Sequence, residues 1–193
     1  MKTILVKDNI KTFIPKSRVN YVILGTMASS CARMIDNVPP EEAFYYHNKK
    51  NQFWKILSYI FYGELRAIDT IIERQNFLEK FGIAMANIVE SAEVPELESN
   101  NSSDDILFEA YNLKKLEVKS IADEFKNLLL TKPIFFTCKH KMPLACLLEN
   151  YFRRNELGME NILEKIHFLP SPTRCSPEVR SRRWKEMGLA LKK

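Results

Sequence analysis

Short apolar runs alternate along the chain with segments in which apolar residues recur at helical spacing. The run at 18–25 (RVNYVILG) is rich in β-branched and aromatic residues and ends at Gly25, which predicts a buried strand followed by a tight turn. Similar runs at 81–89, 134–137 and 166–169 predict three further strands. Because amphipathic segments separate them, we expect a four-stranded parallel sheet covered on both faces, an α/β chain.

Apolar spacing also predicts the helices, and composition marks one loop between them. The predicted helices are 51–61, 68–80, 118–130, 143–151 and 178–191, with one more beginning near Ile106. The stretch 90–105 (ESAEVPELESNNSSDD) is acidic and lacks aromatic residues, so we expect a mobile loop there. With 193 residues, the chain 1–193 is expected to form a single domain.

Composition excludes several classes of protein. With 46% hydrophobic and 27% charged residues, the chain can bury a core, unlike a disordered or coiled-coil chain. No apolar run reaches the roughly 20 residues of a membrane span, and 1–8 alternates apolar and polar residues, so we expect a cytoplasmic monomer without membrane contact. The four cysteines form no CxxC pair, so neither a metal site nor a disulfide framework is expected.

Charge is distributed unevenly. Lys and Arg outnumber Asp and Glu by 9 to 4 in residues 1–59 and by 13 to 6 in 132–193, whereas 60–131 carries 7 against 14. A basic surface that faces phosphate explains the two basic ends, and solvated helix faces explain them equally well.

Ligands of parallel sheets bind beyond the carboxyl ends of the strands, so the candidate binding and catalytic residues are sought in three loops there. The first, GTMASS at 25–30, is a small-residue turn without the spacing of a dinucleotide loop or a P-loop, so no cofactor is expected. The second, FYYHNKKNQFW at 44–54, interleaves aromatic rings with Lys49 and Lys50, which suits stacking on a base beside a phosphate. A purely structural interpretation makes Asn51 a helix cap and places Phe53 and Trp54 in the core.

The third loop, LPSPTRCSP at 169–177, contains three prolines that restrict its backbone. Arg174 and Ser176 are candidate phosphate contacts in this loop, although a rigid connector would have the same composition. On the same edge of the sheet, His140 is a candidate donor to a base or a phosphate.

Together these segments resemble the uracil-DNA glycosylase superfamily. GTMASS after the first strand, FYYHNKKNQFW some twenty residues on, GIAMANIVES and FLPSPTRCSP follow in its order, and the Tyr-Tyr-x-x-x-x-Asn-x-Phe-Trp element is the most specific part. The spacing is most similar to the hypoxanthine-DNA glycosylase branch, with the mismatch-specific uracil-DNA glycosylases next.

The resemblance implies a three-layer α/β/α sandwich and hydrolysis of the N-glycosidic bond of a base flipped out of damaged or mismatched DNA, duplex or single-stranded. It implies that Tyr46 stacks on the base and that Asn51 acts in catalysis with the backbone amides of Met27 and Ala28. The other implied contacts are Gly25, Thr26, His140 and Ser171 for the substrate and Lys49, Lys50, Thr173, Arg174, Ser176 and Arg180 for DNA.

Departures from the superfamily pattern leave alternatives open. Asn87 stands where an Asp is common in GIAMANIVES, and the loop 137–141 (TCKHK) lacks the usual glycine. Met27 or Ala28 stands where many superfamily members have a polar residue that positions water, and Leu169 stands where other branches have a histidine. A catalytically silent nucleic-acid-binding relative is therefore the alternative to an active glycosylase. An unrelated small-molecule enzyme on a parallel sheet is a third possibility, for which the sequence offers no cofactor loop.

Overall fold

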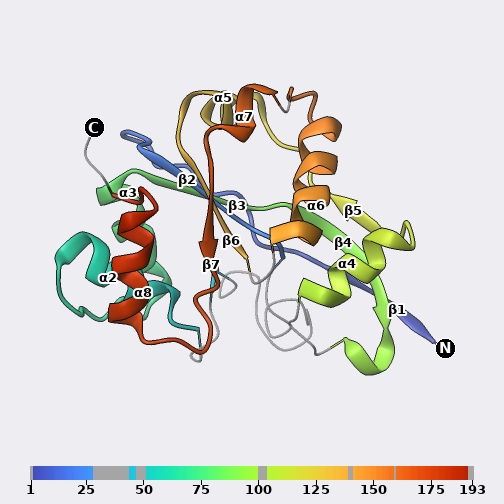
Figure 1. The fold of residues 1–193 in the computed structure, drawn as a ribbon, viewed down its shortest axis with the longest axis horizontal. Coiled ribbons are helices and arrows are strands. Elements are labelled where there is room, and N and C mark those ends of the chain that lie inside the picture. Colours follow the sequence, from blue (N-terminus) through green and yellow to red (C-terminus); the bar gives the residue numbers. More distant parts are fainter. Residues whose placement is uncertain are drawn as a thin grey trace.

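A four-stranded parallel sheet lies at the centre of the computed structural model, which describes residues 2–27, 44–46, 51–99, 104–138, 141–158 and 160–190 (Figure 1). Its strands occur in the order β3-β2-β6-β7. They are β2 (Tyr21–Gly25), β3 (Ile83–Asn87), β6 (Ile134–Cys138) and β7 (Ile166–Pro170). The four strands predicted from apolar runs are thus the four strands of this sheet.

Alternate side chains of the sheet enter two separate cores. Val22 and Leu24 of β2 join one hydrophobic cluster, and Ile23 between them joins the other. Because both faces are buried, each strand reads as an unbroken apolar run. The chain is therefore a three-layer α/β/α sandwich, as predicted.

Helices form the two outer layers, on opposite sides of the sheet in Figure 1. The first layer consists of α2 (Phe53–Tyr62), α3 (Ile71–Phe81) and α8 (Pro177–Glu186). The second consists of α4 (Asp104–Asn112), α5 (Asp123–Thr131), α6 (Lys141–Arg154) and the short α7 (Glu160–Leu163). Within the described residues, no helix is long and apolar enough to cross a membrane.

A second, antiparallel sheet corrects the expectation of a mobile acidic loop at 90–105. Its strands are β1 (Thr3–Lys7), β4 (Val89–Pro95) and β5 (Leu116–Val118), in the order β1-β4-β5, and a 3-10 turn (Glu96–Glu98) follows β4. Glu90 and Glu93 are exposed while Val89, Ala92 and Val94 are buried. Glu90 and Glu93 therefore mark the solvent face of a strand, whereas 100–103 of the expected loop lie outside the described residues.

Ile88 alone separates β3 from β4, so one stretch of chain passes from the parallel sheet into the antiparallel one. The amides of Ile88 and Val89 donate to the carbonyl oxygens of Gly25 and Thr26, at 3.0 and 2.9 Å. These bonds fix the end of β2 against the start of β4. The carboxyl edge of the parallel sheet is therefore braced by the second sheet.

Candidate functional site

The carboxyl ends of the parallel strands gather Gly25, Asn87 and Thr137, and the loop after β7 continues from the same edge. The arrowhead of β7 points towards this edge, which is the lower one in Figure 1. Ligands of open parallel sheets bind at this end. The segment around Tyr46 and the start of α2 are brought to the same edge by the contacts described next.

Tyr46 bridges the ends of two strands. Its ring stacks on Phe53 at a centroid distance of 3.8 Å, and its hydroxyl shares a hydrogen bond with the hydroxyl of Thr137. A methyl group placed on Gly25 would lie 3.6 Å from the Tyr46 hydroxyl oxygen. Tyr46 also has a positive φ of 53°, an uncommon conformation for a non-glycine residue. The ring predicted to stack on a base thus lies at the strand ends.

Tyr45 points instead into the core, as its neighbours Phe53 and Trp54 do. Its hydroxyl lies 2.8 Å from the carbonyl oxygens of Lys11 and Met85, and burial, with a smaller effect of the Asp8 charge, raises the pKa of the phenol well above its ordinary value. The two adjacent tyrosines therefore serve different purposes: Tyr45 anchors the segment and Tyr46 faces the strand ends.

Asn51 lies just before helix α2, whose N-cap is Gln52, without a side-chain capping hydrogen bond. The Oδ1 of Asn51 accepts a hydrogen bond of 2.9 Å from the backbone N–H of Phe53, the first residue of the helix, so the N-cap expected at Asn51 lies one residue further along the chain. The side chain is half-buried, and its Nδ2 has no acceptor among the described residues. The amide can therefore keep its hydrogen bond with Phe53 and still donate one to a ligand.

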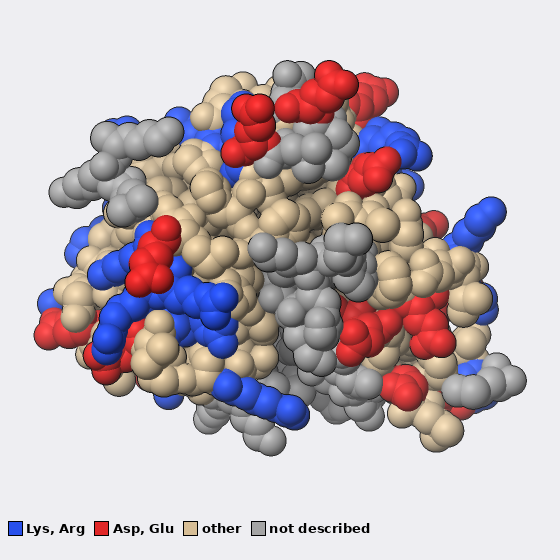
Figure 2. All heavy atoms as spheres, in the orientation of Figure 1, with Lys and Arg blue, Asp and Glu red and all other residues tan. Residues whose placement is uncertain are grey.

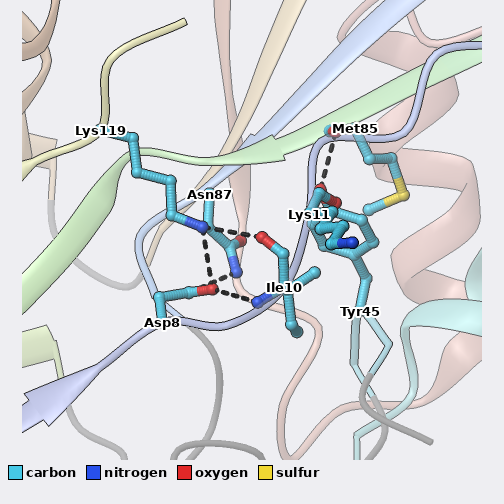
Figure 3. Close-up of polar contacts among 7 residues, drawn as sticks. All are labelled: Asp8, Ile10, Lys11, Tyr45, Met85, Asn87 and Lys119. Atoms are coloured by element: carbon cyan, nitrogen blue, oxygen red, sulfur yellow. Dashed lines mark hydrogen bonds and ion pairs between the residues drawn. The ribbon is translucent and has the colours of Figure 1, made fainter. Parts of the chain in front are cut away.

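Gly25 makes room for Asn87 across the sheet. A methyl group at Gly25 would lie 2.6 Å from Asn87 Oδ1, so a side chain is excluded there and the amide oxygen lies against the end of β2. The Nδ2 of Asn87 donates to Asp8 at 2.8 Å, and Lys119 forms an ion pair of 3.0 Å with the same carboxylate (Figure 3). A buried polar network thus reaches the strand ends from the second sheet.

The residues after β2 have different surroundings. The Thr26 hydroxyl donates to Asp104 Oδ1 at 2.6 Å, which places a carboxylate of α4 beside the first loop. The Met27 side chain packs against the core on the α4 side, and its backbone N–H donates no hydrogen bond within the described part of the chain. The Met27 amide is thus compatible with its predicted role as a donor.

The proline-containing loop after β7 meets the start of α2. The backbone N–H of Gln52 donates to the carbonyl oxygen of Pro172 at 3.1 Å, and the indole N–H of Trp184 donates to Pro170 at 3.0 Å. Within the loop, the hydroxyl groups of Ser171 and Thr173 lie 2.9 Å apart in a mutual hydrogen bond. The second and third candidate loops therefore form one surface.

Basic groups continue this surface along α8, where Figure 2 shows them gathered. Arg182 forms an ion pair of 2.7 Å with Glu178, whereas Arg174, Arg180 and Arg183 have no carboxylate partner among the described residues. Arg174 has a positive φ of 48°, and the exposed Ser176 precedes the helix without capping it. Acidic groups lie over α4 on the other side of the same face.

Several candidate residues lie outside the described residues: Ala28, Lys49, Lys50 and His140. Of the residues at the edge, sequence reasoning did not anticipate Asp8, Thr137, Asp104 and Lys119 as part of the site. The sequence around each gives no sign of its partner, because the partners are distant along the chain and only the folded sheets bring them together.

A hollow of about 810 Å³ lies at the opposite edge of the parallel sheet, where Tyr21 begins β2 and Pro133 precedes β6. Its lysines have a structural explanation, since Lys80 and Lys132 stand at the carboxyl ends of α3 and α5. A helix dipole favours cations at that end. The hollow is thus separate from the candidate site.

No protein-family model and no curated protein matches this sequence. Among solved structures, the chain is similar to the solution NMR structure of a candidate uracil DNA glycosylase from Methanosarcina acetivorans. The TM-score is 0.53 and the identity 19%, over 94% of this chain and 95% of the other. At this identity the similarity concerns the fold, so the chain has a uracil-DNA glycosylase-like α/β/α fold with a four-stranded parallel sheet.

Proposed function

We propose that this chain is a DNA glycosylase that hydrolyses the N-glycosidic bond of a flipped-out deaminated base, hypoxanthine or uracil, and leaves an abasic site. The observation that carries the proposal is the convergence of Tyr46, Asn51 and Asn87 at the carboxyl edge of a sheet with this fold. Each offers a group that can bind a base flipped out of the DNA duplex, either a ring to stack on or an amide that forms hydrogen bonds with the polar edge of the base.

Stacking is the first step of the mechanism. Phe53 covers one face of the Tyr46 ring at 3.8 Å, so a base would stack against the opposite face. The hydrogen bond to Thr137 and the packing of Phe53 in the core hold the ring before the base arrives. A ring fixed in advance loses less entropy on binding than a mobile one.

The polar edge of the base is read by Asn87 in this proposal. Hypoxanthine and uracil both present a ring N–H beside a carbonyl group, and the Oδ1 of Asn87 accepts a hydrogen bond from such an N–H. Cytosine and adenine present a ring nitrogen acceptor and an amino group at the corresponding places. An acceptor at the strand ends therefore favours deaminated bases over their amino precursors.

Bond cleavage requires stabilisation of negative charge on the leaving base and of positive charge on the sugar. Backbone N–H groups after β2, Met27 among them, and the Nδ2 of Asn51 are donors that would stabilise the departing base. Asn51 is too weakly basic to abstract a proton from water, so it contributes by positioning water and by electrostatics. We accordingly expect slow turnover.

DNA would contact the surface formed by the loop after β7 and by α8. Arg174, Arg180 and Arg183 have no carboxylate partner within the described residues, so their charges are available to phosphates. Thr173 and Arg174 lie in the proline-containing loop, where they would enter the gap that the flipped base leaves in the duplex.

The test is base release under single-turnover conditions from labelled oligonucleotides that carry uracil, hypoxanthine or an undamaged base. Asn51→Ala removes both the oxygen that accepts from the Phe53 amide and the Nδ2 donor, whereas Asn51→Ser keeps an acceptor oxygen and removes only the donor. We expect wild type to release a deaminated base, and both variants to lose that activity while Asn51→Ser keeps wild-type stability. Equal activity of Asn51→Ser and wild type would remove Asn51 from the mechanism.

One contact favours the alternative, a catalytically silent nucleic-acid-binding protein: the Oδ1 of Asn51 is already engaged by the Phe53 amide. The same assay separates the two functions. Salt-dependent binding of the oligonucleotides without release of any base would favour the silent relative. The absence of both binding and base release would contradict the glycosylase and the silent relative alike.

A further inference from the structure

Asp8 is a carboxylate enclosed by the two sheets, one residue after β1. Its side chain has no exposed surface. Oδ1 accepts hydrogen bonds from the backbone N–H of Ile10 at 2.9 Å and from Lys119 Nζ at 3.0 Å, and Oδ2 accepts one from Asn87 Nδ2 at 2.8 Å (Figure 3). Burial of a charge is costly unless it is paired, so this arrangement is specific to the folded chain.

Lys119, which balances the charge, is itself held in place. Its Nζ also donates to the carbonyl oxygen of Ile10 at 2.7 Å, and only 12% of its side chain is exposed. The buried Asn155 side chain donates to the Lys119 carbonyl oxygen at 2.9 Å and accepts from the Ile121 amide at 2.9 Å. The ammonium group is thereby fixed on one side of Asp8, and Asn87 lies on another.

An ionised carboxylate only accepts hydrogen bonds, so its neighbour must present a donor. Asn87 therefore turns its Nδ2 towards Asp8 and its Oδ1 towards Gly25, where a methyl group would lie 2.6 Å from that oxygen. Rotating the amide by half a turn would set Oδ1 against the carboxylate and lose the hydrogen bond. With Asp8 paired to Lys119, the amide has one stable orientation.

We propose that Asp8 is a positioning residue that fixes the Asn87 amide with its oxygen towards the base, and so gives the site its selectivity for bases with a ring N–H. The inference rests on the proposed glycosylase function and extends it to a residue of the second sheet that touches no substrate. Lys119 acts with Asp8 by forming an ion pair with its buried carboxylate.

The test replaces Asp8 by Asn, which can accept or donate and so permits both orientations of the Asn87 amide. Release of uracil is compared with release of cytosine, and release of hypoxanthine with release of adenine. We expect the ratio of deaminated to amino base to fall by at least about tenfold in Asp8→Asn. The matched control is Glu93→Gln, which removes one negative charge from an exposed pair with Lys115 and leaves Asn87 untouched.

A second variant distinguishes positioning from folding. The exchange Asp8→Asn with Asn87→Asp keeps the net charge and the pair, but now residue 8 donates and residue 87 presents an acceptor to the base. We expect this exchange to restore the selectivity that Asp8→Asn loses. A ratio that stays at the wild-type value in Asp8→Asn, while both rates fall equally, would overturn the proposal and leave Asp8 a purely structural role.

A readout without catalysis keeps the two proposals separate. In NMR spectra of the whole chain, we expect the side-chain NH₂ of Asn87 to show one slowly exchanging proton that loses its protection in Asp8→Asn but not in Glu93→Gln. If the wild-type chain releases no base, the glycosylase function fails, and the relative affinity of the variants for free uracil and cytosine decides the role of Asp8. An Asn87 amide that exchanges rapidly in wild type would overturn the positioning role.

Discussion

Tyr46 brings two separable groups to the strand ends, a ring that stacks on Phe53 and a hydroxyl that bonds to Thr137. We expect Tyr46→Phe to release base within about fivefold of wild type, because one hydrogen bond contributes about 1 kcal/mol. Tyr46→Ala removes the stacking surface, which contributes about 1 to 3 kcal/mol, so the rate of base release should fall by about 5- to 150-fold. Single-turnover rates measure both, and equal losses would assign the function to the hydroxyl.

Glu79 connects a helix to the segment before β2. Its carboxylate accepts hydrogen bonds from the backbone N–H groups of Lys16 and Ser17, at 2.9 and 3.0 Å, and these bonds, first that of Lys16, lower its pKa. A pKa that is lower in the folded chain stabilises the fold above the ordinary glutamate pKa, and this contribution disappears as the pH falls through the lowered value.

We therefore expect Glu79→Gln to be less stable than wild type near neutral pH and to approach it on acidification. Urea midpoints measured between about pH 6 and about pH 3 test this. Thr131, whose hydroxyl donates to the carbonyl oxygen of Asn127, provides a control as Thr131→Val, for which no such convergence is expected. A difference that is constant over this range would show that Glu79 acts without its charge.

At the scale of elements, two helices end in glycines with a left-handed backbone, and their surroundings differ. Gly63 after α2 has a φ of 80° and no atom within 4 Å of an added methyl group, whereas a methyl group at Gly82 after α3 would lie 2.5 Å from the Arg18 carbonyl oxygen. Both alanine variants carry the left-handed cost of about 1 to 2 kcal/mol. Because of the backbone clash, we expect the free energy of unfolding of Gly82→Ala to fall by roughly 1 kcal/mol or more beyond that cost.

Urea unfolding of the two variants measures the difference directly. Gly63→Ala serves as the control for the conformational cost, because it carries no clash. Equal losses of unfolding free energy in the two variants would mean that the backbone around Arg18 and Gly82 shifts to accommodate the methyl group.

Helices and strands that leave a pattern in neighbouring residues were predictable from the sequence. The parallel strands are continuous apolar runs and the helices have regular apolar spacing, so sequence located both. The helices expected at 118–130 and 178–191 are shorter in the structure, at Asp123–Thr131 and Pro177–Glu186. The strands β1, β4 and β5 were missed because each depends on a distant partner: Thr3 pairs with Pro95, and Val89 with Val118. The exposed charges of β4 indicated a loop when only neighbouring residues were considered, and Val118 of β5 falls within the helix predicted at 118–130.

The candidate site was predictable where its residues belong to a local sequence motif. Tyr46 and Asn51 belong to a compact motif, and Asn51 accepts a hydrogen bond from the first amide of α2, although the N-cap residue is Gln52. Asp8 and Lys119 carry no such motif, and they are 111 residues apart. Groups that act through another side chain are hidden from sequence because their partners are set by the topology of two sheets.

The whole molecule separates its charges, with basic groups over α8 and acidic groups over α4 on one face (Figure 2). We expect Arg180→Ala with Arg183→Ala to weaken DNA binding for every sequence and to lower the slope of log affinity against log salt by about 1 for each lost phosphate contact. Fluorescence anisotropy over a salt series measures this slope. Arg182→Ala is the control, because Arg182 is paired with Glu178, and an equal change in the control would contradict an interface on this face of α8.

The pairing of β1 with β4 also has a consequence for synthesis on the ribosome. Asp8 is made early, but Asn87 follows 79 residues later and Lys119 111 residues later. At about 5 to 20 residues per second, the carboxylate waits roughly 5 to 20 s for its counter-charge. The amide that would read the base is thus oriented only after Lys119 has been made, when β6 and β7 of the parallel sheet are still to be synthesised.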